Sequence, residues 1–252
     1  MSLYANLIHQ ASLIAQHEGL ILEDFGTSTT CVYALIRQAN QHYIGVALLP
    51  QGEGEFTPLC ATSCEEVFDQ SLDFDPLHRA LGLALANAIA RYRLGSEKIP
   101  LQKGARALLP QKLLELTKEG DEIVFVGNLE PVIKKMRQEG RKPLVFCRQK
   151  NRLSDEVHSD IFEYEALASS KIAVITGAAL IGSTVDAISA ISPKGSVRIL
   201  AGFSAGVHPS WLSGSGFTHV ASMLLEPSIK ESLFRHQWEE IFSYPAYFLP
   251  IP

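Results

Sequence analysis

The spacing of hydrophobic residues in the first hundred positions indicates strands and helices that do not alternate. Leucine, alanine and isoleucine side chains recur at helical spacing over residues 3–17 and predict a helix. Strands are expected at 20–26, 31–38 and 42–49, and two more helices at 63–70 and 75–94. The longer helix has Asp75 as its predicted N-cap and Pro76 in its first turn. Strands followed by helices are typical of an α+β fold.

From residue 121 onward the pattern changes, because short, mostly apolar runs alternate with helical segments. We expect strands at 121–128, 142–148, 171–177, 197–204 and 219–225, and helices at 129–140, after Ser183 and around 227–242. This alternation predicts an α/β fold with a parallel sheet covered by helices on both faces. The polar stretch at 95–110, punctuated by Pro and Gly, separates the two patterns. We therefore expect an α+β domain over residues 1–100 and an α/β domain over residues 101–252.

The segment SYPAYFLPIP, residues 243–252, combines apolar side chains with spaced prolines. Proline lacks a backbone N–H and disrupts a helix interior, so this segment is not expected to be helical. We expect it to pack as an extended arm, either on its own chain or on a partner. An exposed apolar segment marks a contact surface, so the second alternative predicts a homo-oligomer or an assembly protein.

Composition and charge narrow the classes of function. Hydrophobic residues make up 46% of the 252 positions and charged residues 19%, so the chain can build a globular core. The formal net charge of −5 leaves no basic surplus for phosphates, which disfavours nucleic-acid binding. The first residues lack the features of a signal peptide, and no apolar run approaches the roughly 18 residues of a membrane span. Four cysteines do not make a disulfide framework in a chain of this length, so we expect a cytoplasmic protein.

Small and hydroxyl-bearing residues follow several of the predicted strands. In an open parallel sheet, ligands bind outside the carboxyl ends of the strands, where loops converge. The residues of this kind are Gly127, Asn128, Thr176, Gly177, Gly202, Ser204 and Gly206. Short turns between strand and helix need such residues in any case. Their concentration at three strand ends nevertheless predicts a ligand site, because glycines let backbone N–H groups approach a ligand closely.

The stretch ITGAALIGSTVDAI, residues 175–188, comes close to the phosphate-binding loop G-x-x-x-x-G-K-[ST]. Ser183 occupies the position of the lysine, and the loop interior is apolar and without glycine. ATP binding through this loop is therefore disfavoured. We interpret the stretch as a strand-end turn followed by a helix with Ser183 as N-cap and Asp186 completing a capping box.

The predicted helix at 75–94 is apolar on almost all sides, which is typical of a helix buried on two faces. Gly82 and the alanines of this helix permit neighbouring elements to approach closely. Asn87 and Arg91, four residues apart, share one flank and are candidates for ligand binding. A buried Asn87 needs hydrogen-bond partners. One alternative is a structural bond to backbone groups, the other is a role in binding a ligand or the other domain, and both stay open.

The eight histidines are scattered and match no histidine-based metal motif. His208 is the best candidate for a metal ligand, acid or base, because it precedes Pro209 in a glycine-rich loop at a strand end. Its alternative role is to cap or support that loop. Cys60 and Cys64 are too loosely spaced to predict a structural zinc site. A divalent metal is therefore a candidate cofactor without an identified ligand set.

Several motifs, taken in order, resemble a known family. HRALGLALANAI resembles the R-x-x-G-x-A-x-x-N-A signature of a bacterial and archaeal family labelled "putative heavy-metal chelation". VFVGNLEPVIKKMR, AVITGAALIGSTVDAI and LAGFSAGVHPSWL resemble its later motifs, in the same order. The resemblance covers residues 20–225, and its specificity lies in the ordered set. It implies an enolase-N-terminal-like α+β domain followed by a Rossmann-like three-layer domain with a parallel sheet.

The resemblance also implies functional positions. The matching residues are Arg79, Gly82, Ala84, Asn87, Ala88, Gly127, Thr176, Gly177, Leu180, Thr184, Gly202, His208 and Pro209. Gly182 and Phe203 depart from the family pattern, which has asparagine and proline there, so position 182 supplies no side-chain hydrogen bond to a ligand. The family label implies metal handling, either by binding metal or by making or processing a small chelating molecule.

Three hypotheses of function follow. The first is a small-molecule-binding protein or enzyme whose site lies in the cleft between the two domains and takes an anionic or chelator-related ligand. In this hypothesis the helix with Asn87 and Arg91 faces the loops at Gly127, Thr176 and Ser204. The second is a direct metal-binding protein, and the third is a non-catalytic assembly protein. We favour the first.

Overall fold

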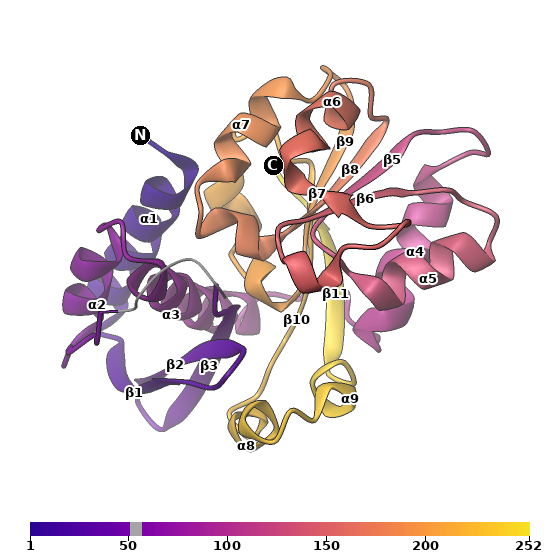
Figure 1. Cartoon of the computed structure of the whole chain (residues 1–252). Helices are drawn as coiled ribbons and strands as arrows, with labels where there is room; N and C mark the ends of the chain where they lie inside the picture. The colour runs from indigo at the N-terminus through magenta and orange to yellow at the C-terminus, as the bar shows by residue number, and fades with distance from the viewer. Residues whose placement is uncertain (51–56) are drawn as a thin grey trace.

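Two sheets dominate the described part of the structure, a computed structural model that covers residues 1–50 and 57–252 without the side chains of Lys103, Ala105 and Lys150. The first sheet is antiparallel in the order β1-β2-β3, with β1 at Ile21–Thr27, β2 at Cys31–Gln38 and β3 at Gln41–Leu48. Three helices accompany it: α1 (Leu3–Glu18), α2 (Cys64–Ser71) and α3 (Pro76–Gly95). Helix α3 packs on β2 and β3, while α1 and α2 pack on α3 (Figure 1). The elements predicted for this part of the chain are confirmed.

Within the described residues, the second sheet has the strand order β4-β11-β10-β9-β8-β5-β6-β7. Its strands are β4 (Gln102–Lys103), β5 (Ile123–Val126), β6 (Leu144–Cys147), β7 (His158–Ser159), β8 (Ile172–Thr176), β9 (Val197–Ala201), β10 (His219–Met223) and β11 (Pro245–Pro250). Strands β5 to β10 run parallel, whereas β11 is antiparallel to β10 and to β4. A small antiparallel sheet and a larger, mostly parallel one confirm the predicted mixed fold class.

The helices of the second part connect these strands. They are α4 (Ala105–Leu116), α5 (Glu130–Gln138), α6 (Glu163–Leu167), α7 (Thr184–Ile191), α8 (Ile229–Phe234) and α9 (Trp238–Ile241). Helix α4 begins in the stretch interpreted as a boundary, contains Pro110 and extends beyond that stretch to Leu116. The prediction of one last helix around 227–242 is wrong, because His236 adopts a left-handed backbone with φ 54° and separates α8 from α9. Among the described residues, none of the helices has the length and apolar character needed to cross a membrane.

The proline-spaced arm is β11. It pairs with β10 over the register His219↔Pro250 to Met223↔Ala246 and lies between β10 and β4. The expectation of an extended arm is confirmed, and the arm packs on its own chain. Its Tyr247 side chain is 1% exposed, so the apolar residues of this segment contribute to the core of this molecule.

The strand order creates a switch point between β5 and β8. From β5 the chain proceeds to β6 and β7 on one side, and then crosses to β8, β9 and β10 on the other side. At such a point the two loops that follow the central strands diverge and leave a crevice, which is where open α/β sheets bind ligands. The loops concerned begin at Gly127 and Gly177.

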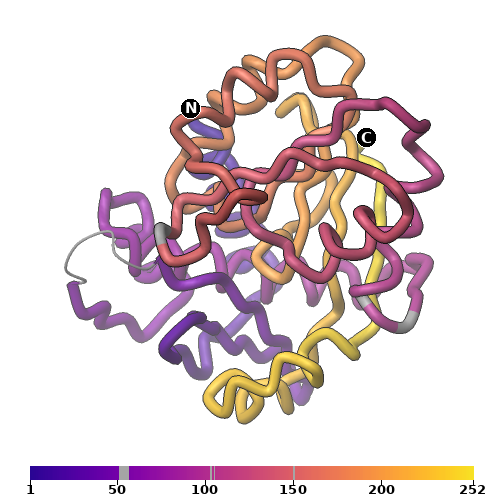
Figure 2. The backbone as a smooth tube through the Cα atoms, turned by 45° about the vertical axis from the view of Figure 1, so that its right-hand side comes forward, coloured from indigo at the N-terminus to yellow at the C-terminus, as the bar shows by residue number. Residues whose placement is uncertain are grey.

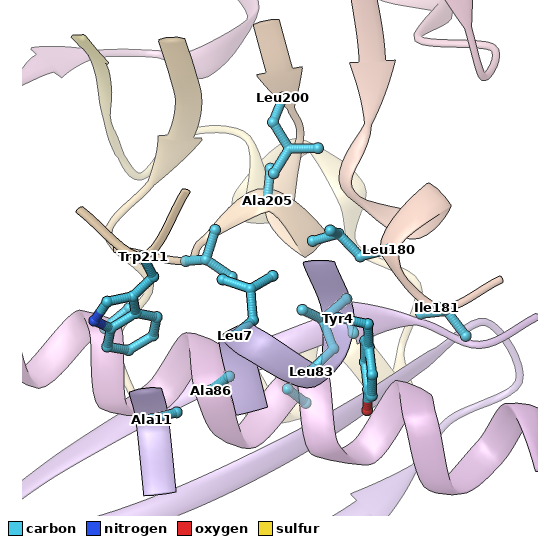
Figure 3. Packing of buried hydrophobic residues seen from close by; sticks show 14 of the residues in the cluster. Tyr4, Leu7, Ala11, Leu83, Ala86, Leu180, Ile181, Leu200, Ala205 and Trp211 are labelled. Atoms are coloured by element: carbon cyan, nitrogen blue, oxygen red, sulfur yellow. The ribbon is translucent and has the colours of Figure 1, made fainter. Parts of the chain in front are cut away.

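The two parts of the chain share one hydrophobic core. Figure 3 shows Tyr4 and Leu7 of α1 and Leu83 of α3 packed near Leu180 and Leu200 of the second part. All five side chains are at most 2% exposed. Burial of this apolar surface stabilises the contact by about 25 cal/mol per Å² removed from water. The second sheet begins at Gln102, close to the predicted boundary at residue 100, but a division into two domains stays a prediction.

Helix α3 lies very close to its neighbours because of glycines. A Cβ atom on Gly45 of β3 would lie 2.0 Å from Ala84 O and 2.2 Å from Ala88 N of α3. A Cβ atom on Gly82 would lie 2.3 Å from Ser71 Cβ. The predicted close approach at this helix is confirmed, and only glycine fits at these two positions.

The α8–α9 segment extends from the second sheet to the first one, as Figure 2 shows in yellow beside the indigo strands. Ile229 and Leu233 of α8 belong to one hydrophobic cluster with Tyr33 and Val46 of the first sheet. Lys230 forms an ion pair with Asp24 and lies over the Tyr33 ring. This segment therefore provides a second contact between the two parts of the chain.

Candidate functional site

A cavity of about 560 Å³ lies at the carboxyl ends of β5, β6, β8 and β9. The first part of the chain contributes Thr30, Leu48 and Pro50 to its lining, and the second part contributes the rest. The volume is in the range of cavities that bind small organic molecules. The cavity is thus formed between the two parts of the chain, at the switch point of the large sheet.

The loops after β5 and β8 form the floor of this cavity. Gly127 has φ 101°, a left-handed conformation that favours glycine, and a Cβ atom there would lie 2.7 Å from Thr176 Cγ2. Thr176 Oγ1 accepts a hydrogen bond from Ala178 N–H and begins the 3-10 helix η3 (Gly177–Leu180). The start of the loop after β5 thus lies against Thr176 at the end of β8, because Gly127 has no side chain at this contact.

The structure brings five of the nine sequence-predicted residues together in the cavity lining: Gly127, Asn128, Thr176, Gly202 and Ser204. Ser204 lies in the 3-10 helix η4 (Phe203–Ala205), and its Oγ accepts a hydrogen bond from Leu48 N–H (2.9 Å). This bond fixes the end of β3 to the loop after β9. Gly177 lies outside the lining, because a Cβ atom there would be 2.3 Å from Ala205 N.

Asn87 and Arg91 bind backbone groups of both parts rather than line the cavity. Asn87 Nδ2 donates to Val46 O (2.9 Å) and to Ser204 O (3.3 Å). Arg91 Nε donates to Leu225 O (3.2 Å), and its guanidinium pairs with Glu226 (2.6 Å). Of the alternatives left open for Asn87, the backbone and inter-part contacts are the ones observed. These residues support the site by fixing α3 to the loops that surround it.

His208 also lies outside the cavity lining. Its Nδ1 accepts a hydrogen bond from Ser210 N–H, so the side chain caps the 3-10 helix η5 (Pro209–Leu212). Its Nε2 lies 3.0 Å from Glu97 Oε1. The alternative role of His208, capping its loop, is therefore the observed one. Over residues 1–50 and 57–252, no group of three or more His, Cys, Asp or Glu side chains is arranged to hold a metal ion.

The predicted capping box at Ser183 and Asp186 is wrong. Ser183 has a left-handed backbone with φ 56° and makes no side-chain cap bond. Its Oγ accepts a hydrogen bond from Arg79 Nη1 (2.8 Å), and Asp186 Oδ1 accepts one from Leu3 N–H (2.9 Å). Contacts with the first part of the chain thus take the place of the local cap. The stretch forms η3 and a tight turn instead of a phosphate-binding loop.

Three charged residues at the β6–α6 side of the cavity were not predicted from sequence. Arg148 follows β6, Asp160 lies in the 3-10 helix η2 (Asp160–Phe162), and Glu163 begins α6; all three line the cavity. Arg148 Nε donates to Asp160 Oδ2 (2.8 Å). Glu163 is 3% exposed, and burial, with a contribution from Asp160, raises its pKa from 4.5 to about 7. The strand predicted at 142–148 ends at Arg148, so the sequence indicated a position at a strand end for this residue. No local pattern in the sequence indicated Glu163.

A family model described as "Putative heavy-metal chelation", DUF364, matches residues 110–245. The match covers more than half of the chain. This chain belongs to the DUF364 family. An uncharacterized protein of Methanocaldococcus jannaschii is 29% identical to it over 216 residues, which are 83% of this chain and 81% of that protein.

Two solved structures of DUF364 proteins of unknown function have similar folds. The protein of Pyrococcus horikoshii has a TM-score of 0.83 and 21% identity, and the alignment covers 99% of this chain and 100% of that one. The protein of Desulfitobacterium hafniense has a TM-score of 0.71 and 13% identity, with 97% and 98% covered. At these identities the likeness shows that the DUF364 fold extends over nearly the whole chain.

Several positions that matched the DUF364 motifs have structural roles here. The Arg79 guanidinium donates to Ile181 O (3.0 Å) as well as to Ser183, and it stacks on the Tyr4 ring at 4.8 Å. Thr184, the first residue of α7, lines the cavity. Gly182, where the family pattern was not matched, lies 3.4 Å from Arg148 Nη1 when a Cβ atom is added. A Cβ atom at this position would be in ordinary van der Waals contact with the Arg148 guanidinium.

Proposed function

We propose that this DUF364 protein binds a small organic molecule, anionic or chelator-related, in the cavity at the switch point, and that this binding serves metal handling. The observation that carries the proposal is the place of the cavity: it lies between the loops after β5 and β8, and both parts of the chain line it. The link to metal handling comes from the family description. The chemistry of the ligand is argued from the lining.

The cationic residues of the lining support an anionic portion of the ligand. Arg106 of α4 and Arg152 line the cavity from two different segments. Arg106 Nη1 pairs with Glu239, whereas its Nε has no hydrogen-bond partner within the described residues. Guanidinium groups suit carboxylate and phosphate oxygens, because they present N–H donors in a planar fork. The apolar lining, which includes Phe146 and Ile181, suits the carbon skeleton of an organic molecule.

The other two hypotheses have less support. A direct metal site needs converging His, Cys or carboxylate ligands, and the described residues form no such group. The assembly hypothesis relied on an exposed apolar arm, and β11 packs inside its own sheet. Oligomeric state, the absence of a nucleic-acid partner and a cytoplasmic location stay predictions.

A cavity-blocking variant tests the proposal. Ala178 lines the cavity and is half-buried, so Ala178→Phe places a ring in the ligand volume. Ala187→Phe, at an exposed position of α7, is the matched control. We expect some members of a panel of small organic acids and aminocarboxylate chelators, with and without divalent metal, to raise the Tm of the wild type and of Ala187→Phe but not of Ala178→Phe. If no compound stabilises the wild type, or if Ala178→Phe responds equally, the proposal fails.

A further inference from the structure

The side chain of Glu163 is a buried acid with an incomplete set of hydrogen bonds. It is 3% exposed and lines the cavity, and its Oε2 has no hydrogen-bond partner within the described chain. Leaving a buried polar atom without a partner is costly, and native structures rarely do so without a functional reason. A bound molecule in the cavity is in a position to supply the missing donor.

The charged groups next to Glu163 do not supply it. Arg148 and Asp160 pair with each other through Nε and Oδ2 at 2.8 Å, so the positive charge near Glu163 is largely balanced by Asp160. Asp160 raises the pKa of Glu163, and Arg148 lowers it by a smaller amount. When Glu163 ionises, this side of the cavity therefore carries an excess negative charge, which favours a cationic or N–H-bearing group.

Other residues of the cavity lining also have buried atoms without a hydrogen-bond partner. Among the described residues, six side-chain atoms are buried without a hydrogen-bond partner, and three of their residues line the cavity: Arg106, Glu163 and Tyr247. Arg106 Nε and Tyr247 Oη are donors on α4 and β11, whereas Glu163 is an acceptor on α6. In the order of the sheet, β11 lies on one side of the switch point and β6 and β7, which precede α6, lie on the other. The unpartnered atoms of the lining thus divide into donors on the side of β11 and α4 and an acceptor on the side of β6 and β7.

We propose that Glu163 binds a nitrogen group of the ligand, such as an amidine, a guanidine or a protonated amine, while the side with Arg106 and Tyr247 takes an oxygen acceptor such as a carboxylate. The ligand is therefore an amphoteric molecule with a basic nitrogen group and an oxygen acid. This inference rests on the proposed function, since it requires that the cavity holds a small molecule. Beyond the proposed function, this inference specifies the chemical class of the ligand and names Glu163 as the residue that binds its nitrogen group.

Benzamidine is a suitable probe, because its amidinium can donate two parallel N–H bonds to a carboxylate and its ring suits the apolar lining next to Ile181. Calorimetric titration at pH 8 compares the wild type with Glu163→Gln. Glu165→Gln is the matched control, because Glu165 is exposed on the same helix. We expect Glu163→Gln to weaken benzamidine binding by about ten- to a hundredfold, the usual worth of a hydrogen bond to a charged group, and Glu165→Gln to leave it unchanged.

The outcomes separate this inference from the proposed function. Binding that is equal in the wild type and in Glu163→Gln, but abolished in Ala178→Phe, places benzamidine in the cavity without Glu163 and overturns the inference alone. If benzamidine does not bind to the wild type, the inference about Glu163 is overturned as well. The proposed function is then still tested by the panel of organic acids and chelators. Failure of both the panel and benzamidine overturns the two proposals together. A circular dichroism spectrum of Glu163→Gln that matches the wild type ensures that lost binding does not reflect unfolding.

Discussion

Replacing Glu163 with glutamine should change the dependence of stability on pH in the ligand-free protein. In the folded chain, burial and Asp160 raise the pKa of Glu163 from 4.5 to about 7. Between these two values the folded state binds more protons at this site than the unfolded state does, so the free energy of unfolding falls as pH rises. The loss begins near pH 4.5 and is complete above pH 7. Glutamine cannot ionise, so the variant does not suffer this loss.

The magnitude follows from the size of the rise. Each pKa unit corresponds to about 1.4 kcal/mol, so a rise from 4.5 to about 7 destabilises the folded protein by about 3 kcal/mol at most at pH 8. Relaxation of the surroundings when the carboxylate ionises lowers this value, so we expect about 1–2 kcal/mol. When pH is raised from 5 to 8, the free energy of unfolding of Glu163→Gln should thus increase by about 1–2 kcal/mol relative to that of the wild type.

Urea unfolding at pH 5, 6, 7 and 8, followed by circular dichroism, measures this difference. Using the difference between variant and wild type removes the contribution of the other titrating groups. Glu165→Gln, exposed on the same helix, should give a curve parallel to the wild type at every pH. A Glu163→Gln curve that is also parallel to the wild type would refute the reasoning, because it would mean that Glu163 ionises in the folded state as readily as in the unfolded one.

Three further predictions concern the support of the site. Gly45→Ala should lower the free energy of unfolding by about 3 kcal/mol or more, as measured by urea unfolding, because its Cβ would lie 2.0 Å from Ala84 O. The control Gly95→Ala should change this free energy by less than about 1 kcal/mol. Asn87→Ala should lower the free energy of unfolding by about 1–3 kcal/mol, because the Asn87 amide donates to carbonyls of β3 and η4. An unchanged unfolding midpoint would contradict that role. Deleting residues 245–252 should abolish the dispersed amide signals of the folded state in NMR spectra, and a dispersed spectrum would show that the sheet forms without β11.

Local signals in the sequence predicted most elements of the fold. Strand β2 was expected at 31–38 and is found at Cys31–Gln38, because a run of β-branched and apolar residues there is bounded by turn residues. Helix α3 begins after Asp75, whose carboxylate accepts hydrogen bonds from the N–H groups of Leu77 and His78. Both signals depend on residues close in sequence.

The errors occurred where distant contacts decide the local structure. Ser183 has the sequence of an N-cap, but its hydroxyl is used by Arg79, which is far away in the chain. His236 interrupts a regular helical pattern, and its Nε2 lies 3.0 Å from Thr29 Oγ1 in the first part of the chain. No pattern of neighbouring residues indicates such contacts.

The candidate site was predicted in part for the same reason. The glycines and hydroxyl residues singled out at strand ends lie at the edge of the sheet where the cavity is, because strand ends can be read from the hydrophobic pattern. Glu163 could not be identified in this way, since its importance comes from burial against Arg148 and Asp160, which the crossing from β6 to β8 brings about. Its sequence context, two acids in a short helix, is typical of a solvent-exposed segment.

The position of β11 has a consequence for the order of folding. Strand β4 is the edge of the described sheet, and its neighbour there is β11, which the ribosome synthesises much later. Until β11 emerges, β10 has one unpaired edge and β4 has no strand to pair with, so the large sheet stays incomplete although its other strands have been synthesised. The nascent protein must therefore protect an open sheet edge from pairing with other chains until β11 is in place.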